Sequence, residues 1–230
     1  ADDAISEEHL DATAITGHTA LAETPADTDE FLISDGGVLK RLDASYVGGS
    51  DFVRIATSRS SSGTPGVNFD DVFDGSVYEH YRVFGYVAGA VNAGADMYWR
   101  TGGSSGSTYT TGDYHYVADG RYMDNSSGDG GYDHKGYNEN KFRLATDCRV
   151  DSDSAYTLFD LLISDPTTSQ MSRAYITGTV GWQDNTAQQH VTTSWAGRNN
   201  ANVNATGLRF QMESNNINYH HIQLWGFKKA

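Results

Sequence analysis

The chain of 230 residues is acidic, with a formal net charge of −14 from 30 acidic and 16 basic residues. A field of that sign repels phosphate backbones, so nucleic acid is not an expected partner. Cys148 is the only cysteine, which excludes a fold held together by intrachain disulfides. The sequence has neither a run of about 18 apolar residues nor a basic start followed by an apolar run, so we expect no membrane insertion and no signal peptide.

Glycine is abundant and proline is scarce, with 25 Gly against 3 Pro. No stretch longer than about ten residues shows the helical period of an amphipathic helix. This composition favours short strands joined by many turns, and therefore an all-β protein. The length suits a β-sandwich preceded by a small module.

The first fifty residues contain one recognisable element, a β-hairpin. Two short apolar runs, 31–34 and 38–42, flank an Asp-Gly-Gly turn at 35–37, and glycine adopts the positive φ that a tight hairpin requires. Two isolated strands bury too little apolar surface to offset their ordering entropy. We therefore expect residues 1–50 to form an attachment and oligomerisation module whose hairpin packs against copies of itself. The apolar side chains available for these contacts are Phe31, Ile33, Val38, Leu39, Leu42 and Tyr46.

A Val-Gly-Gly-Ser hinge leads into a second domain, residues 51–230. Alternating apolar and polar residues there predict about eight strands at the spacing of a two-sheet sandwich. Both faces of the strand at 77–87 carry aromatic residues, so we expect it to lie in the interior of a sheet. We predict an antiparallel, jelly-roll-like β-sandwich. Its strands fall within residues 76–87, 96–100, 114–117, 141–150, 155–164, 174–182, 207–213 and 220–229.

The Gly-rich segment 122–140 holds several potential oxygen ligands for calcium. The candidate ligands are Asp124, Asp129, Asp133 and the neighbouring His134. The spacing differs from an EF-hand loop, because Ser126 and Gly128 occupy ligand positions and no glutamate closes the loop. Asp, Asn and Gly also tolerate turn geometries. We therefore predict an ordinary solvated loop without a bound metal.

The sequence contains no motif that indicates catalysis. The adjacent His220 and His221 would point to opposite faces of a strand and could not share one metal ion. Cys148 lies on the apolar side of its predicted strand, where a thiol behaves as a small hydrophobe. Nucleophile elbows, phosphate loops and dinucleotide fingerprints are absent. With 30 carboxylates a chance glycosidase pair is nearly certain and carries no weight. We expect a non-enzymatic protein without a cofactor.

Tyrosines recur between residues 109 and 137 among Gly, Ser, Asp and Asn. This mixture combines rigid amphipathic contacts with adaptable hydrogen bonding, and it suits sugars or protein surfaces. The alternative is that these tyrosines lie in the sandwich core or in contacts between identical subunits. The candidate receptor or glycan contacts are Tyr109, Tyr114, Tyr116, Tyr122, Tyr132, Tyr137 and, further along the chain, Trp195.

Residues 15–47 read ITGHTALAETPADTDEFLISDGGVLKRLDASYV. The Ile-Thr-Gly and Ala-Leu start, the Pro-Ala-Asp-Thr-Asp-Glu and Ser-Asp-Gly-Gly segments, Leu-Lys-Arg and the closing Tyr resemble a short module of tailed-bacteriophage fibre and other virion proteins. More loosely, the segments VNFDDVFDGSVYEHYRVFGYV, LLISDP and HHIQLWGFKK resemble strands of the β-sandwich domains that follow this module.

This resemblance implies a non-enzymatic virion structural protein, a short tail-fibre or spike-type component made in the host bacterial cytoplasm and carried on the virion surface. The implied partners are further copies of the chain in a homotrimer, other virion proteins that contact the N-terminal segment, and a glycan or protein of the host surface. The alternatives are a capsid-decoration or head-fibre protein and a sandwich-fold glycan-degrading enzyme.

Overall fold

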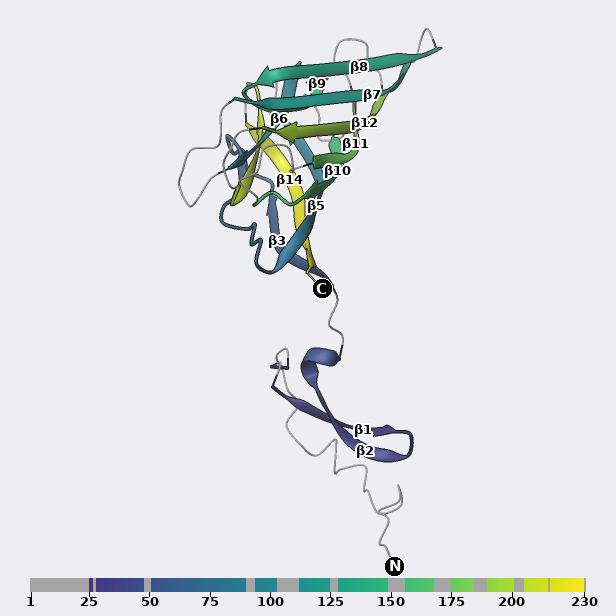
Figure 1. Ribbon diagram of the computed structural model, residues 1–230. Helices are drawn as coiled ribbons and strands as arrows, with labels where there is room; N and C mark the ends of the chain where they lie inside the picture. The colour runs from purple at the N-terminus through teal and green to yellow at the C-terminus, as the bar shows by residue number, and fades with distance from the viewer. Residues whose placement is uncertain are drawn as a thin grey trace, which may run out of the picture. The chain divides into compact units, whose positions relative to one another are not determined.

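The computed structural model describes residues 25–26, 28–47, 51–89, 94–102, 112–124, 128–148, 156–167, 175–183, 190–200, 205–214 and 216–229 (Figure 1). Backbone contacts divide the chain into two units, Ala1–Ser50 and Asp51–Ala230. In the ranges given above, no helix is long and apolar enough to cross a membrane.

The first unit contains the β-hairpin that the sequence predicts. Strand β1 (Glu30–Asp35) pairs antiparallel with β2 (Val38–Asp43), and a short 3-10 turn, η2 (Ala44–Tyr46), follows. Gly36 and Gly37 form the two-residue turn with φ values of 59° and 85°. A Cβ atom is disfavoured at both positions, so the Gly-Gly pair fixes the place of the turn and with it the register of the hairpin.

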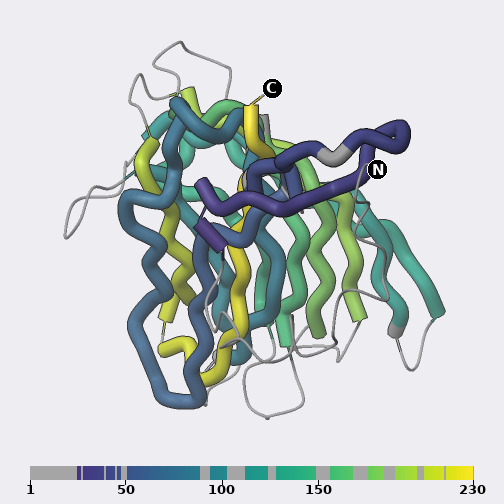
Figure 2. The backbone as a smooth tube through the Cα atoms, turned by 90° about the horizontal axis from the view of Figure 1, so that it is seen from below, coloured from purple at the N-terminus to yellow at the C-terminus, as the bar shows by residue number. Residues whose placement is uncertain are grey.

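The second unit consists of two antiparallel sheets, which confirms the predicted all-β sandwich (Figures 1 and 2). The strands of the larger sheet, in spatial order, are β3 (Phe52–Ser60), β14 (Ile217–Lys228), β5 (Tyr78–Gly89), β10 (Thr157–Ser164), β11 (Tyr175–Gln183), β12 (His190–Asn199), β7 (Tyr114–Asp124) and β8 (Gly128–Glu139). Those of the smaller sheet are β4 (Val67–Phe69), β13 (Gly207–Met212), β6 (Ala95–Gly102) and β9 (Phe142–Cys148). The chain passes repeatedly from one sheet to the other, as in a jelly roll.

The core lies between the inner faces of the two sheets, where alternate residues of each strand are buried. Its centre is an aromatic cluster. Trp99 of β6 stacks on Phe142 of β9 with ring centroids 4.9 Å apart, and it meets Trp195 of β12 edge-on at 6.1 Å. Phe210 of β13 stacks on Phe159 of β10 at 4.7 Å. These contacts join the two sheets through large ring surfaces.

The strand predicted at 77–87 lies in the interior of a sheet, as expected, and the expected residues within it point into the core. Tyr81, Val83 and Val87 are buried, and β5 lies between β14 and β10 in the interior of the larger sheet. The prediction for 122–140 was wrong, because 128–139 forms strand β8 rather than a loop. β8 is the edge strand of the larger sheet, and pairing with β7 along nearly its whole length supplies hydrogen-bond partners on one side of its backbone, so its glycine-rich composition did not prevent a strand.

Two leucines on β10 provide a matched test of the core. Leu161 is fully buried, whereas Leu158 is 57% exposed. Leu161→Ala leaves a cavity and is expected to lower the free energy of unfolding by about 2–5 kcal/mol, while Leu158→Ala changes it by about 0.5 kcal/mol or less. Urea unfolding of the full chain, followed by tryptophan fluorescence, measures both. Equal losses of unfolding free energy in the two variants would contradict the assignment of Leu161 to the inner face and Leu158 to the outer face of β10.

Candidate functional site

Three of the predicted contact residues lie in the core, which corrects their assignment to a binding surface. Tyr114, Tyr116 and Trp195 are 0%, 7% and 2% exposed. The Tyr114 hydroxyl donates to the backbone carbonyl of Thr101 at 3.0 Å, and the Trp195 indole N–H donates to that of Arg143 at 3.0 Å. All three side chains occupy inward positions, and the polar atoms of Tyr114 and Trp195 are bonded within the protein, so these residues stabilise the sandwich.

The other predicted tyrosines differ in their exposure. Tyr122 and Tyr132 are half-buried and pack against the core. Tyr137 near the end of β8 is 81% exposed. Tyr109 lies outside the described residues. Of the predicted tyrosines that the structure describes, Tyr137 is therefore the one with an open ring.

The predicted anchoring residues of the hairpin are distributed over both of its faces. The β1–β2 register places four of them on one face: Phe31, Ile33, Val38 and Leu42. Phe31 is 41% and Val38 59% exposed, so apolar side chains lie open to solvent on this face, beside the Lys40–Asp35 ion pair. The strand position of Leu39 belongs to the other face, and its side chain lies outside the described part of the chain. Tyr46 in η2 is 76% exposed.

The candidate calcium ligands are not brought together. His134 occupies an inward position on β8 and Asp133 the next, outward one, while Asp129 forms an ion pair with Arg121 at 3.0 Å. The side chain of Asp124 lies outside the described residues. Among the residues that the structure describes, no group of three or more His, Cys, Asp or Glu side chains is placed to hold a metal ion.

The outer face of the larger sheet carries a row of aromatic side chains that the sequence analysis did not assign to a site. Phe84 and Tyr86 point outward from β5, and Trp225 of β14 stacks beside Phe84 at 6.5 Å. Phe52 stacks on Trp225 at 4.8 Å, and Tyr156 meets Tyr86 edge-on at 5.0 Å. We call these five side chains the aromatic row. The sequence did indicate part of this row, because aromatic residues occupy both faces of the strand predicted at 77–87, and one of these faces is the outward one.

The sheet is hollowed beside the aromatic row. Two adjoining hollows of about 350 and 280 Å³ share Leu158, Gly181 and Thr192. They form because large residues on β5 and β10 stand next to small residues on β11 and β12, where Leu158 pairs with Gly181 and Gly181 with Thr192. We call this depression the groove. Its lining also includes Phe84, Tyr86, Tyr156, Asp160 and Thr179.

A bidentate ion pair lies at the side of the groove. Arg82 donates from Nε to one carboxylate oxygen of Asp160 at 2.8 Å and from Nη2 to the other at 2.6 Å. This hydrogen bonding raises the pKa of Arg82. The guanidinium carbon also lies 5.4 Å from the Phe84 ring centroid. Arg82 therefore holds Asp160 in one orientation at the groove, so that its carboxylate is positioned before a ligand arrives.

A row of polar side chains in contact with one another lies along the outer face of β14. The Trp225 indole N–H donates to the Gln223 side-chain oxygen at 3.1 Å, and the Gln223 amide nitrogen lies 3.3 Å from His221 Nε2. The His221 ring in turn meets Tyr86 edge-on at 6.2 Å. Flat apolar rings beside fixed carboxylate, amide and hydroxyl groups suit a ligand with apolar C–H faces and hydroxyl edges, which is the chemistry of a sugar ring.

Cys148, His220 and His221, which the sequence analysis considered for reactivity, are not placed as a catalytic or metal site. Burial raises the pKa of the Cys148 thiol to about 12, so the thiol is protonated and unreactive. His220 is buried, with Nε2 2.9 Å from the Ser58 hydroxyl oxygen, whereas His221 faces outward. The two histidines point to opposite faces of β14, as predicted.

Fold and geometry together define an all-β sandwich with a grooved outer sheet face. Comparison of the chain with protein-family models, with curated proteins and with solved structures finds no match.

His134 makes the stability of the sandwich dependent on pH. Its Nε2 lies 3.1 Å from the Arg143 carbonyl oxygen, and burial lowers its pKa. The unfolded chain takes up a proton near the ordinary histidine pKa of about 6.5, whereas the folded state resists it until lower pH. The stability that this depressed pKa contributes is therefore present above pH of about 6.5 and is lost as the pH falls.

His134→Gln is expected to reduce the fall in unfolding free energy between pH of about 7.5 and 5. The decrease persists in part, because burial also lowers the pKa of His220. Urea unfolding at several pH values measures the slope, with the exposed His190→Gln as the matched control. A slope that is equal in His134→Gln and in the parent chain would contradict the prediction.

Proposed function

We propose that the chain is a non-enzymatic structural protein of a bacteriophage virion, a short tail-fibre or spike-type component that binds a glycan of the host surface through the groove. The observation that carries the proposal is the groove itself, an open hollow beside outward aromatic rings and the fixed Asp160 carboxylate. The virion assignment is supported by the sequence features of residues 15–47.

A sugar matches the groove in size and chemistry. A hollow of about 350 Å³ falls in the range of small-molecule sites. Tyr86 and Tyr156 offer ring surface for the C–H face of a pyranose, while Asp160 and Thr192 offer oxygen atoms for its hydroxyl groups. The groove crosses several strands and is open along its length, so it suits an internal stretch of a polysaccharide.

Binding is favoured over hydrolysis by the carboxylates available. Glycosidases use two carboxyl groups about 5–9.5 Å apart. Asp160 is the one carboxylate among the described residues that line the two hollows, and it is bonded to Arg82 through both oxygens. Turnover of a polysaccharide by the protein, abolished by Asp160→Asn, would favour the enzyme alternative instead.

The hairpin supports the assembly part of the proposal. Its open face carries Phe31 and Val38, and a two-stranded ribbon gains stability when such a face is buried against an equivalent copy. We therefore assign self-association, as a homotrimer, and contacts with other virion proteins to residues 1–50. A capsid-decoration or head-fibre protein would use the same contacts, and imaging of the particle distinguishes the two locations.

The groove is tested by blocking it. Gly181 faces the hollow, and a Cβ added there meets its nearest atom at an ordinary 3.6 Å, so Gly181→Tyr attaches a ring beside the groove without a clash at Cβ. Gly181→Tyr and Tyr86→Ala are each expected to weaken binding to a host glycan, identified on an array, by about tenfold or more. The matched control is Tyr137→Ala. An equal loss of glycan binding in the control, or no loss of binding in either groove variant, would contradict the proposed site.

Self-association is tested on the hairpin face. Phe31→Ser combined with Val38→Ser is expected to reduce the particle mass from a multiple of 25.0 kDa toward the monomer, because the buried apolar area is lost. Light scattering coupled to size exclusion measures the mass, with Val77→Ser, an exposed valine outside the hairpin, as control. A parent chain that is monomeric at micromolar concentration would overturn this assignment while leaving the groove untouched.

A further inference from the structure

A separate hollow of about 420 Å³ adjoins the aromatic row on the outer face of the larger sheet. It is lined by Tyr86 and Tyr156 of the aromatic row together with Arg59, Ser61 and Tyr219. We call this depression the tyrosine hollow. Tyr86 also lines one hollow of the groove and Tyr156 lines the other, and the two rings meet edge-on at 5.0 Å. These two rings therefore form the boundary between the groove and the tyrosine hollow.

The strand registers align the tyrosine hollow with the groove along one line across the sheet. Tyr86 pairs with Leu158 on one side and with His221 on the other. Cross-strand partners point to the same face of a sheet, so the line stays on the outer face. It runs over six neighbouring strands through direct partners: Arg59, His221, Tyr86, Leu158, Gly181 and Thr192. Five steps of about 4.8 Å between strands make it about 24 Å long, the length of several sugar rings.

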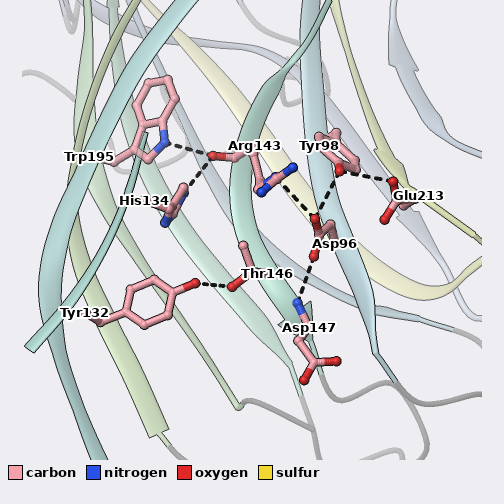
Figure 3. A network of polar contacts seen from close by, with 9 residues as sticks. All are labelled: Asp96, Tyr98, Tyr132, His134, Arg143, Thr146, Asp147, Trp195 and Glu213. Carbon is pink, nitrogen blue, oxygen red and sulfur yellow. Dashed lines mark hydrogen bonds and ion pairs between the residues drawn. The ribbon is translucent and has the colours of Figure 1, made fainter. Parts of the chain in front are cut away.

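The polar groups of the tyrosine hollow are available to a ligand. Tyr132, which packs against the core, instead uses its hydroxyl in a hydrogen bond with Thr146 (Figure 3). In the part of the chain that the structure describes, the hydroxyls of the three tyrosines in the hollow form no hydrogen bond, and neither does the Arg59 guanidinium. A tyrosine hydroxyl both donates and accepts, and a guanidinium donates, so these groups suit the hydroxyl groups of a sugar.

The lining of the tyrosine hollow also restricts the class of ligand. The described residues that line it are tyrosine, serine, arginine and histidine, with no aliphatic side chain among them. Flat rings suit the C–H face of a sugar, whereas a lipid chain or an apolar peptide would leave the polar groups without partners. The net charge of −14 repels a polyanion from the whole surface. A neutral glycan satisfies both conditions.

We propose that the tyrosine hollow is a second sugar subsite, and that the ligand is a neutral, linear glycan that lies across the strands from the groove to Arg59. This inference rests on the proposed function, because it extends glycan binding at the groove. A glycan that occupies both depressions passes over Tyr86 and Tyr156, so a single sugar in the groove reaches neither Arg59 nor Tyr219. The affinity of the protein should therefore depend on the length of the glycan.

The experiment titrates the full chain with three neutral, linear series, malto-, cello- and chito-oligosaccharides, each from the monosaccharide to the hexasaccharide. In at least one series the Kd, measured by NMR titration, is expected to fall by about tenfold or more as sugars are added, since the second depression then contributes contacts of its own. Affinity that does not change with length but is lost in Gly181→Tyr would retain the groove and overturn the subsite. Binding of no member of any series would overturn the neutral, linear ligand, and the array test still decides on the groove.

Single variants locate the added contact. Tyr219→Ala and Arg59→Gln are each expected to weaken hexasaccharide binding by about tenfold and to leave monosaccharide binding at the groove within about twofold. Tyr137→Ala and Arg198→Gln make the same changes at exposed positions of the larger sheet and are expected to leave both within about twofold. Equal weakening by Arg59→Gln and Arg198→Gln would show a net-charge effect and reject the subsite.

A milder variant separates loss of the subsite from loss of the fold. Tyr219→Phe keeps the ring and removes the hydroxyl, and it is expected to weaken hexasaccharide binding severalfold with unchanged thermal unfolding. Monosaccharide binding is the second control, because a merely structural effect would weaken the short and the long probe alike. Such parallel weakening, or unchanged hexasaccharide binding in both Tyr219→Phe and Arg59→Gln, would overturn the subsite.

Discussion

The aromatic contact between the two sheets is the interaction on which the other features of the sandwich depend. Trp99 stacks on Phe142 and Phe210 within the smaller sheet and meets Trp195 of the larger sheet edge-on. Large rings in stacked and edge-on geometry bury much apolar area at a fixed sheet separation. Because successive side chains of a strand point to opposite faces, the residues that alternate with these core residues point away from the core. The groove is made from such outward residues of the larger sheet.

Strand alternation made part of this arrangement predictable. A period of two is enough to tell which residues of one strand share a face, so the burial of Tyr81 and Val83 followed from sequence. It gives no information on which strands become neighbours. Arg82 meets Asp160 and Trp225 only through the registers of β5 with β10 and β14, and these pairings join distant parts of the chain. The groove was therefore outside the reach of sequence reasoning.

Two errors had a common physical origin. Strand β8 resembled a loop because glycine and aspartate are turn residues, and β12 was missed because polar or small residues, among them Thr192, Ser194 and Ala196, fill its outward positions. Both sequences form strands because neighbouring strands supply their backbone partners, which outweighs local preference. The alternation of Val191, Thr193 and Trp195 was the available signal on β12, and without it Trp195 was assigned to a surface although it lies in the core.

The proposed self-association of the first unit would compensate for weak glycan binding by a single copy of the second. An open, shallow groove with one fixed carboxylate leaves much of a sugar in water, so a single copy is expected to bind weakly. Joining several copies makes later binding events intramolecular and raises the overall affinity by roughly 10²–10⁴ without any new contact. A hairpin that does no more than associate with itself would supply this gain. Residues 1–50 therefore need no ligand site of their own, and the groove needs no greater depth.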